Sequence, residues 1–506
     1  MTTTTPERRA DGEERRLHPW SWLFVLLGSM RQFLFPLLLL LVFGGRREEG
    51  LQLAGAGVAV AVLAIVSVWR YFTYRYRIEG DSLFIRSGLF ERSLRQVPFS
   101  RIHNVELTQT LLHRIFGVAE VRLESAGGSR PEAQMRVLEL EEALALERLI
   151  RHRGRDGAAP VDDAAAAPGQ VLLALPTAEI VRLGLVSNRG MVVVGAAFAL
   201  ASQVLPENTF RHLFERIWQQ GSGYVAAWQG GVPGPVLAAT GLVVLAVALL
   251  RLFSVVLALL RYHGFRLRAH GRRLTIERGL LARVRSSVSR RRIQAWTLRE
   301  GVLHRAFARR SLAIDTAGAQ GGDNGQAQRH EVSELAPIAT PAACDALVQE
   351  ILEARAWPPA NWHRLHPRAW LRLWLGHVAA GLALAAALAW HFGPWGALGL
   401  LWLPWGWLLA RRNARFAGWH LGERLVAVRE GWWSRHWRFA ELDKLQALQL
   451  RQSPLDRGLG MASLWLDTAG TGAATPPLRL RHLPEAQARA LYGRLAREVA
   501  RRPLRW

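Results

Sequence analysis

The stretch Arg86–Gly127, RSGLFERSLRQVPFSRIHNVELTQTLLHRIFGVAEVRLESAG, decides the fold, because it occurs three times along the chain. It aligns without a gap with Glu277–Gly318 and with Arg429–Gly470. The positions shared by all three copies are Gly88, Arg92, Leu107, Leu112, Arg114, Ala126 and Gly127, then Gly279, Arg283, Leu298, Leu303, Arg305, Ala317 and Gly318, then Gly431, Arg435, Leu450, Leu455, Arg457, Ala469 and Gly470. One constant offset that satisfies so many positions indicates a threefold module.

Pairs of strongly apolar stretches precede the three copies. They are Leu34–Phe43 with Gly55–Trp69, Met191–Val204 with Val236–Leu260, and Trp370–Trp390 with Pro394–Ala410. Several approach or exceed the roughly 20 apolar residues that a helix needs to cross a bilayer. The sequence therefore predicts six membrane spans in three hairpins, although the short third stretch also suits a helix that lies in the membrane interface.

The charge distribution predicts which side of the membrane the modules occupy. The chain of 506 residues carries a net charge of +25, and Lys444 is its only lysine. Arginines follow the second stretch of each pair at Arg70, Arg75 and Arg77, at Arg261, Arg266 and Arg268, and at Arg411, Arg412 and Arg415. The turns inside the first two pairs are balanced in charge, so the positive-inside rule places both termini and all three modules in the cytoplasm. Cys344, the single cysteine, agrees with a reducing compartment.

Within each module the apolar pattern changes to short alternating segments. Arg101–Leu107 and Ala119–Leu123 read as strands joined by turns, and Met135–Leu140 reads as a further strand. An amphipathic helix, Glu141–His152, closes the first copy, and Pro341–Ala354 and Pro484–Arg501 close the other two. Such an order suits a small bent antiparallel sheet whose open end is covered by a helix.

The chain resembles the bacterial pleckstrin-homology (PH)-like membrane proteins of the YdbT-like family. The resemblance rests on GDSLFIRSGLF (Gly80–Phe90), SRIHNVELTQTLLHRIFG (Ser100–Gly117) and LESAGG (Leu123–Gly128), with the echoes RRRIQAWTL (Arg290–Leu298), IDTAG (Ile314–Gly318) and LDTAG (Leu466–Gly470). It implies a multi-pass α-helical protein of the bacterial inner membrane with three cytoplasmic PH-like domains, each a bent antiparallel barrel with a C-terminal helix. It also implies a small companion protein with one PH-like module and a role in envelope protection.

The predicted domain boundaries follow from the three repeats and the apolar pairs. They are a cytoplasmic tail at 1–19, transmembrane hairpin 1 at 20–69, PH-like domain 1 at 70–155, a linker with a juxtamembrane segment at 156–188, hairpin 2 at 189–260, PH-like domain 2 at 261–355, a linker at 356–369, hairpin 3 at 370–411 and PH-like domain 3 at 412–506.

Recurring basic residues are the candidate sites. One group for binding lipid or a partner protein consists of Arg92, Arg283 and Arg435 with Arg101, Arg292 and Lys444, because guanidinium forks bind phosphates in a bidentate manner. If these residues lie on neighbouring strands near the membrane, they can hold headgroups; a structural role remains equally open. For Arg114, Arg305 and Arg457 we favour ion pairs with Glu124, Asp315 and Asp467 over ligand binding. Gly88, Gly279 and Gly431 are expected in equivalent turns with a positive φ.

The sequence offers no constellation for catalysis or for a cofactor. His363 and His366 have a spacing seen in metal sites, but Pro367 and the lack of a third ligand favour a juxtamembrane loop. Trp432, Trp433 and Trp437 serve equally well as interfacial anchors or as a contact between helix and barrel. We therefore expect no enzyme, no metal, no cofactor and no nucleic-acid partner.

The function that these features predict is a membrane scaffold without enzymatic activity. Its PH-like domains would bind anionic lipid headgroups or a partner membrane protein, and a homo-oligomer is left open. The alternative is a transporter or exporter of an amphipathic compound, for which Arg31 and Arg251 are the few candidate intramembrane charges and no acidic relay accompanies them. The sequence does not identify the ligand, the physiological process or the oligomeric state.

Overall fold

The computed structural model divides the chain into two compact units, each described by itself. It describes residues 14–24, 26–27, isolated positions between 58 and 73, then 74–88, 93–125, 133–153, 169–204, 215–216, 234–316, 334–352, 357–468 and 476–501. The first unit holds the first module and most of the chain up to Arg266, together with Thr275–Ser287. The second holds the rest of the second module and everything from Val288 to the C-terminus.

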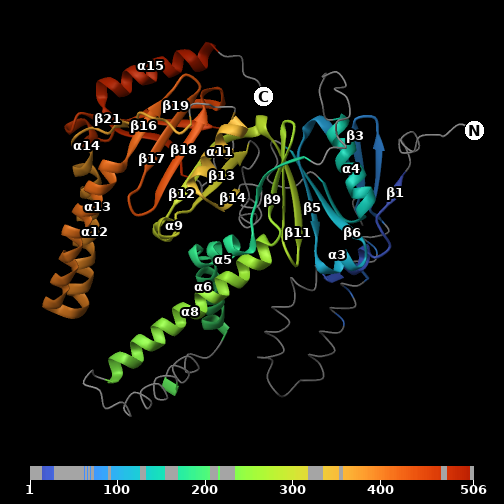
Figure 1. The fold of residues 1–506 in the computed structure, drawn as a ribbon, viewed down its shortest axis with the longest axis horizontal. Coiled ribbons are helices and arrows are strands. Elements are labelled where there is room, and N and C mark those ends of the chain that lie inside the picture. The colour runs from blue at the N-terminus through green and yellow to red at the C-terminus, as the bar shows by residue number, and fades with distance from the viewer. Residues whose placement is uncertain are drawn as a thin grey trace, which may run out of the picture. The chain divides into compact units, whose positions relative to one another are not determined.

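The three modules repeat one order of elements, and in each of them the last strand is followed by a closing helix, labelled α4, α11 and α15 in Figure 1. In the first module the order is β2 (Arg75–Glu79), β3 (Ser82–Ser87), β4 (Ser93–Pro98), the 3-10 turn η2 (Phe99–Arg101), β5 (Ile102–Gln109), α3 (Leu111–Ile115), β6 (Val118–Ser125), β7 (Ala133–Glu139) and α4 (Leu140–Arg153). Each predicted strand of this copy is present, and the predicted closing helix corresponds to α4. The short helix α3 was not predicted.

The other two modules contain the same elements at equivalent positions. The second has β9 (Arg266–His270), β10 (Arg273–Arg278), β11 (Arg283–Ser289), η4 (Arg290–Arg292), β12 (Ile293–Glu300), α9 (Val302–Ala306), β13 (Arg310–Thr316), β14 (Glu334–Ala339) and α11 (Pro341–Leu352). The third has β16 (Gly418–Leu421), β17 (Leu425–Glu430), β18 (Arg435–Glu441), η6 (Leu442–Lys444), β19 (Leu445–Arg451), α14 (Pro454–Gly458), β20 (Met461–Thr468), β21 (Leu478–Pro484) and α15 (Glu485–Arg501).

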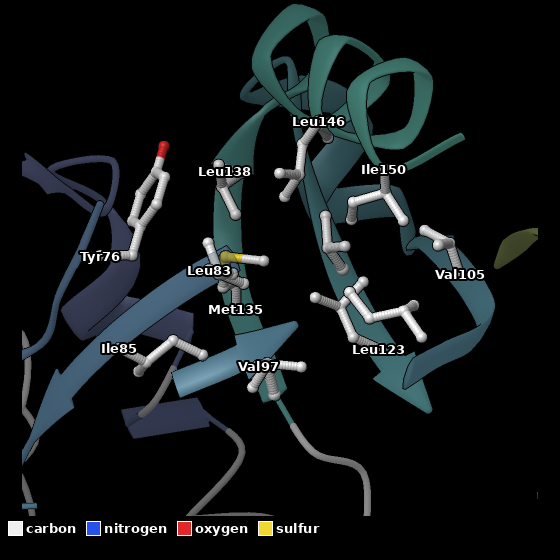
Figure 2. Packing of buried hydrophobic residues seen from close by; sticks show 14 of the residues in the cluster. Tyr76, Leu83, Ile85, Val97, Val105, Leu123, Met135, Leu138, Leu146 and Ile150 are labelled. Carbon is white, nitrogen blue, oxygen red and sulfur yellow. The ribbon is translucent and has the colours of Figure 1, made fainter. Parts of the chain in front are cut away.

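The closing helix of the first module completes its core. Leu146 and Ile150, on one face of α4, are 3% and 2% exposed, and they lie over apolar side chains of the sheet such as Leu83, Val97 and Met135 (Figure 2). An i, i+4 spacing places the two helix residues on the same face. The helix therefore covers apolar surface that the bent sheet would otherwise expose to water.

Strands of successive modules pair with each other, so the sheets run from one module into the next. In the first unit β7, β6, β5, β11 and β10 are neighbours in that order, and β5 of module one pairs antiparallel with β11 of module two. In the second unit the order is β14-β13-β12-β18-β17-β16-β15, with β12 of module two paired with β18 of module three. The alternation of apolar and polar residues did not predict this pairing. It indicates which face of a strand is buried, but not which other strand is hydrogen-bonded along the strand's edge.

Short strands that precede the apolar helices also belong to these sheets. β1 (Arg15–Arg16) pairs with β2, and β15 (His363–Arg364) pairs with β16. β8 (Gln170–Ala174) lies at the corresponding place in the chain before the second pair of apolar stretches. Two of these strands fall in the predicted tail (1–19) and linker (356–369), so the sheets begin before the apolar segments.

The apolar helices are α5 (Thr177–Val186), α6 (Arg189–Val204), α8 (Gly234–Tyr262), α12 (Ala369–Phe392), the 3-10 helix η5 (Gly393–Leu401) and α13 (Trp402–Phe416). Glycines allow α12 to pack closely on the segment that follows it: a Cβ at Gly399 would lie 2.7 Å from Cα of Ala385, and one at Gly406 would lie 2.5 Å from Cβ of His377. Arg251 of α8 donates to the carbonyls of Leu185 (3.0 Å) and Ser187 (3.3 Å), where α5 ends. The charge in this apolar helix therefore satisfies carbonyls at a helix C-terminus.

The structure corrects the predicted fold class. A multi-pass α-helical membrane protein with six spans is wrong, because in the described part only Ala239–Tyr262 and Ala369–Phe416 are long and apolar enough to cross a membrane. The bent pair of α5 and α6, with an angle of 51°, would add one more if it acts as a single span. The described residues also contain four sheets with antiparallel strand pairs, which suit PH-like repeats.

The physical reason lies in the length of the individual helices. The predicted span Met191–Val204 belongs to α6, whose 16 residues rise only about 24 Å, less than the roughly 30 Å of a hydrocarbon core. The predicted span Leu34–Phe43 lies outside the described residues, and only isolated residues of Gly55–Trp69 are described.

Candidate functional site

The candidate site is the end of each module that meets an apolar helix. In module two, the turn between β10 and β11 lies against the C-terminal end of α8. The N–H of Leu280 donates to the carbonyl of Leu260 in the last turn of α8, and the N–H of Gly279 donates to the carbonyl of His263, which directly follows α8, both at 2.9 Å. In module three, the equivalent turn meets α13, where the N–H of Trp432 donates to Oδ1 of Asn413 at 2.6 Å. We call this end of a module the helix-proximal end.

Glycine makes these turns possible. The φ angles of Gly88, Gly279 and Gly431 are 131°, 108° and 83°, so the predicted positive φ is confirmed. A Cβ at Gly279 would lie 1.9 Å from the carbonyl oxygen of Ala282, and one at Gly431 would lie 2.1 Å from that of Ser434. Any side chain would therefore push the turn out of shape.

At the helix-proximal end of module two, three arginines surround one tyrosine. Tyr262, the last residue of α8, is 2% exposed. The guanidinium carbons of Arg189, Arg278 and Arg261 lie 5.3, 5.4 and 5.8 Å from its ring centroid, and Nη1 of Arg189 donates to its hydroxyl at 2.6 Å. The ring faces attract cations, which offsets part of the repulsion among the guanidinium groups.

The helix-proximal end of module three carries a similar set of arginines and indoles. Arg411 of α13 lies over the rings of Trp370 and Trp407, at 4.9 and 4.7 Å, and Arg412 lies 5.4 Å from the ring of Trp432. Arginines stacked on tryptophans at the end of an apolar helix are typical of the boundary between a bilayer and water.

In module one, a hollow of about 280 Å³ lies beside β2, β3 and β4. Arg75, Arg77 and Arg86 line it together with Glu14. Nη1 of Arg75 is 3.0 Å from Oε2 of Glu14, and Arg77 lies 5.1 Å from the ring of Phe84. The hollow is therefore basic and could accept a small anionic group.

The first predicted group of basic residues is Arg92, Arg283 and Arg435, and its described members lie at the helix-proximal ends of the modules. Arg92 is outside the described residues, whereas Arg283 is exposed at the start of β11. Nη1 of Arg435, at the start of β18, is 3.4 Å from Oε1 of Glu300, and its guanidinium carbon lies 4.8 Å from the ring of Phe416. Arg283 is thus available to a ligand, while Arg435 already has a carboxylate partner.

The second predicted group lies at the other end of the strands. Arg292 follows β11 and Lys444 follows β18, so each is a full strand away from the first group, about 20 Å for seven residues. Burial lowers the pKa of Arg292 to about 10, Nζ of Lys444 is 3.4 Å from Oδ2 of Asp443, and Arg101 is exposed. The structure does not bring the two groups together around one phosphate; whether either group binds a ligand stays a prediction.

The third set of arginines reaches from one module to the next. Nη1 of Arg114 donates to the carbonyl of Leu280 at 3.3 Å, and Nη2 of Arg305 donates to the carbonyl of Trp433 at 3.2 Å. Arg457 is exposed. Of the carboxylates that we favoured as partners, Asp315 instead pairs with Arg438, at 2.6 Å.

The remaining candidates have structural neighbours. Trp432 and Trp437 pack against the end of α13, since Trp437 makes an edge contact with Phe416 at 5.8 Å, whereas Trp433 stays 55% exposed. The ring of His363 stacks on Trp419 at 4.5 Å, and Nδ1 of His366 accepts from the N–H of Arg368. Within the described residues no three His, Cys, Asp or Glu side chains come close enough to hold a metal ion.

The sequence prediction missed the cluster around Tyr262. Arg189 and Arg278 are far apart in the chain and neither recurs in all three copies, so the repeat did not point to them. The sequence signal that could have indicated them is their position. Arg189 lies at the start of the apolar helix α6, and Arg278 lies at the end of β10, which leads to the turn against α8.

Comparison with known proteins bears out the threefold repeat. The family model described as "Bacterial PH domain" matches residues 25–154, 224–353 and 371–499. A relative, the UPF0699 transmembrane protein YdbT of Bacillus subtilis (strain 168), is 24% identical over 440 residues, which covers 82% of this chain and 84% of the relative. No solved structure gives a significant match.

Proposed function

The chain belongs to the bacterial PH domain family, and from this premise we propose that it is a membrane scaffold without enzymatic activity, whose modules bind anionic lipid headgroups. The observation that carries the proposal is the arginine and aromatic cluster at the helix-proximal ends. Such a cluster places fixed positive charge where an apolar helix leaves the bilayer, and each juxtamembrane arginine gains about 1 kcal/mol from an anionic leaflet.

A membrane location has two supports. Ala239–Tyr262 and Ala369–Phe416 are long and apolar enough to cross a bilayer, and the relative is named a transmembrane protein. We propose that the modules and both termini lie on the cytoplasmic side, since arginines follow the second apolar stretch of each pair, while the turns inside the first two pairs are balanced in charge. The inner membrane of a bacterium is the corresponding location.

Partner binding is a further part of the proposal. The faces of the modules that do not meet the helices would be available to a second membrane protein, such as the small companion with one PH-like module that the family resemblance implies. A role in envelope protection would follow from such an assembly. For transport of an amphipathic compound, Arg31 lies outside the described residues, and Arg251 is engaged by the carbonyls at the end of α5. The described residues therefore give this alternative no specific support.

Retention of lipid by the intact protein tests the proposal. The chain would be released from nanodiscs that contain equal amounts of phosphatidylglycerol and phosphatidylcholine, and the lipids that remain bound would be identified by native mass spectrometry. We expect retention of phosphatidylglycerol, and a drop of about tenfold or more in its apparent affinity in the double variant Arg411→Gln/Arg412→Gln, at about 1 kcal/mol for each charge.

The matched control neutralises two charges at the other end of module three, Arg424→Gln/Lys444→Gln. Arg424 precedes β17 and Lys444 follows β18, so both lie away from α13. The control should retain phosphatidylglycerol as the unmodified chain does. Equal retention of the two lipids, or loss in the control alone, would overturn headgroup binding at the helix-proximal end.

A further inference from the structure

The two pairings between modules are the same interface, made twice. Arg283 lies opposite Gln109 and Ser287 opposite Val105 where β11 meets β5. Where β18 meets β12, the equivalent residues lie opposite each other: Arg435 opposite Glu300 and Phe439 opposite Trp296. A register shared by both junctions indicates an interface built into the module itself, because a slip of one residue would turn every side chain to the other face.

An arginine at the same position of the repeat makes a hydrogen bond across both junctions. Arg114, in the short helix after β5, reaches the turn before β11, and Arg305, in the short helix after β12, reaches the turn before β18. The repeat position shared by Arg114, Arg305 and Arg457 therefore serves the contact between one module and the next.

The first and last modules each keep one half of this interface unused. β4 is the module-one equivalent of β11 and β18, and it ends the order β1-β2-β3-β4. β19 is the module-three equivalent of β5 and β12, and it ends the order β19-β20-β21. In the described part of the chain, each of these two strands therefore pairs along one side only.

Exposure distinguishes the unused halves from the used ones. Ser286 and Ser287 of β11 are each 2% exposed, whereas their equivalents in β4, Arg95 and Gln96, are exposed, and Leu94 is 69% exposed. Nearly all of β12 is buried, whereas most of β19 is exposed or half-buried. An exposed leucine on an unpaired strand edge is a template for pairing with another chain.

We propose that β19 of one chain pairs with β4 of a second copy of this chain, antiparallel and in the register of the two internal junctions. Ser93 would lie opposite Arg451, Leu94 opposite Leu450 and Arg95 opposite Gln449. The contact joins two different surfaces, so it closes into a ring or continues as a filament.

Complementary charges favour a second copy of this chain as the partner of the two unused strand edges. In the second junction, Nη2 of Arg438 is 2.6 Å from Oδ2 of Asp315, and Nη1 donates to the hydroxyl of Thr297 at 2.9 Å. Arg95 is the repeat equivalent of Arg438 and Asp467 that of Asp315, and both are exposed. The edge of β4 thus carries an arginine, and β20, the neighbour of β19, carries a carboxylate. The equivalents of these two residues already form an ion pair inside the chain.

Arg457 is the module-three equivalent of Arg114 and Arg305, and it is exposed at the end of module three. The repeat position that serves both internal junctions is therefore accessible at the unused half of the interface.

Disulfide cross-linking between two differently tagged chains tests the register. One chain carries Leu94→Cys and the other Leu450→Cys, both with Cys344→Ala and both reconstituted in the same membrane. Residues directly opposite in antiparallel strands have Cα atoms about 4.5–5.5 Å apart, which suits a disulfide. We expect a cross-linked product that carries both tags.

The control for register pairs Leu94→Cys with Gln449→Cys, because neighbouring strand residues point to opposite faces. It should give at most a tenth of the cross-linked product. Equal yields from the two pairs, or no product from either, would overturn the proposed pairing.

A charge exchange tests the specificity without covalent capture. Mass photometry of the detergent-solubilised chain over a range of concentrations should show association that Asp467→Arg or Arg95→Asp weakens about tenfold or more. The chain with both substitutions should associate as the unmodified chain does, and Asp443→Arg, away from the edge, should change nothing. A monomer at every concentration, or equal weakening by the double variant, would contradict the proposal.

Discussion

Single residues fix the turns on which the helix-proximal ends depend. Gly431 has a φ of 83°, and a Cβ there would lie 2.1 Å from a backbone oxygen. We expect Gly431→Ala to lower the free energy of unfolding by roughly 1–3 kcal/mol, since an L residue in such a conformation is strained. The measurement is chemical unfolding of the detergent-solubilised chain.

Gly493 provides the matched control. It lies inside α15, and a Cβ there would meet no atom within 4 Å. Gly493→Ala should leave stability unchanged or raise it, by up to about 1 kcal/mol, because alanine favours a helix over glycine. If both substitutions have the same effect, the turn does not need its glycine.

His482 makes stability depend on pH. Burial lowers its pKa to about 4, with Arg481 and Arg372 acting in the same direction and Asp456 opposing them. The unfolded chain, with an ordinary pKa of about 6.5, then binds more protons than the folded chain between these values. Stability should be full above pH 6.5 and should fall by roughly 2–3 kcal/mol as the pH drops towards 4.

The variant His482→Asn tests this assignment. Residue 482 has a φ of 51°, which asparagine tolerates better than most side chains. Thermal melts between pH 7 and 4 should show a weaker dependence on pH in the variant. Part of the dependence should persist, because burial also lowers the pKa of His436 and His304. An unchanged slope would show that His482 does not titrate in this range.

At the scale of elements, strands hold the modules together through a buried ion pair. Arg438 of β18 is 1% exposed and Asp315 of β13 is 8% exposed. We expect Arg438→Met alone to destabilise the second unit by about 3–5 kcal/mol, because it leaves a buried carboxylate without its partner. Adding Asp315→Leu should recover most of the loss.

The readout is denaturant unfolding of the four chains of a double-mutant cycle. A coupling energy well above about 1 kcal/mol is expected. Additive effects of the two substitutions would mean that the ion pair does not join module two to module three.

The sequence indicated some of these elements and not others, for physical reasons. The alternation in Arg101–Leu107 and the apolar stripe of Glu141–His152 predicted β5 and α4, since burial on one face leaves a periodic pattern. β1 and β15 are two residues long and carry no period. The pairing of β5 with β11 uses backbone groups at strand edges, which every residue except proline supplies, so side-chain types do not reveal it.

For the candidate site, the repeat identified the turn glycines and the exposed Arg283 but placed Arg283 and Arg292 too close together. Seven residues of an extended strand separate them, and strand length is visible only once the boundaries of β11 are known. The cluster around Tyr262 was missed because a three-dimensional fold joins α6, α8 and β10 there.

At the scale of the whole molecule, the length of apolar sequence predicted more membrane helices than the structure shows within the described residues. A run of apolar residues indicates that a segment can move from water into the bilayer. To span the bilayer, the segment must also form one continuous helix that is long enough to cross the hydrocarbon core. α6 is too short and is bent away from α5. The chain is therefore better understood as a series of PH-like modules attached to a few apolar helices.

The depth of the two ends of module three tests the central claim most directly. A spin label would be attached at Ser434 in the helix-proximal turn or at Asp443 at the far end, both exposed, in the chain with Cys344→Ala reconstituted in phosphatidylglycerol bilayers. Power saturation by oxygen and by a water-soluble nickel complex then reports the depth of each label. The account predicts that the label at Ser434 lies at the bilayer surface and the label at Asp443 in bulk water. Equal, water-like accessibility at both positions would contradict it.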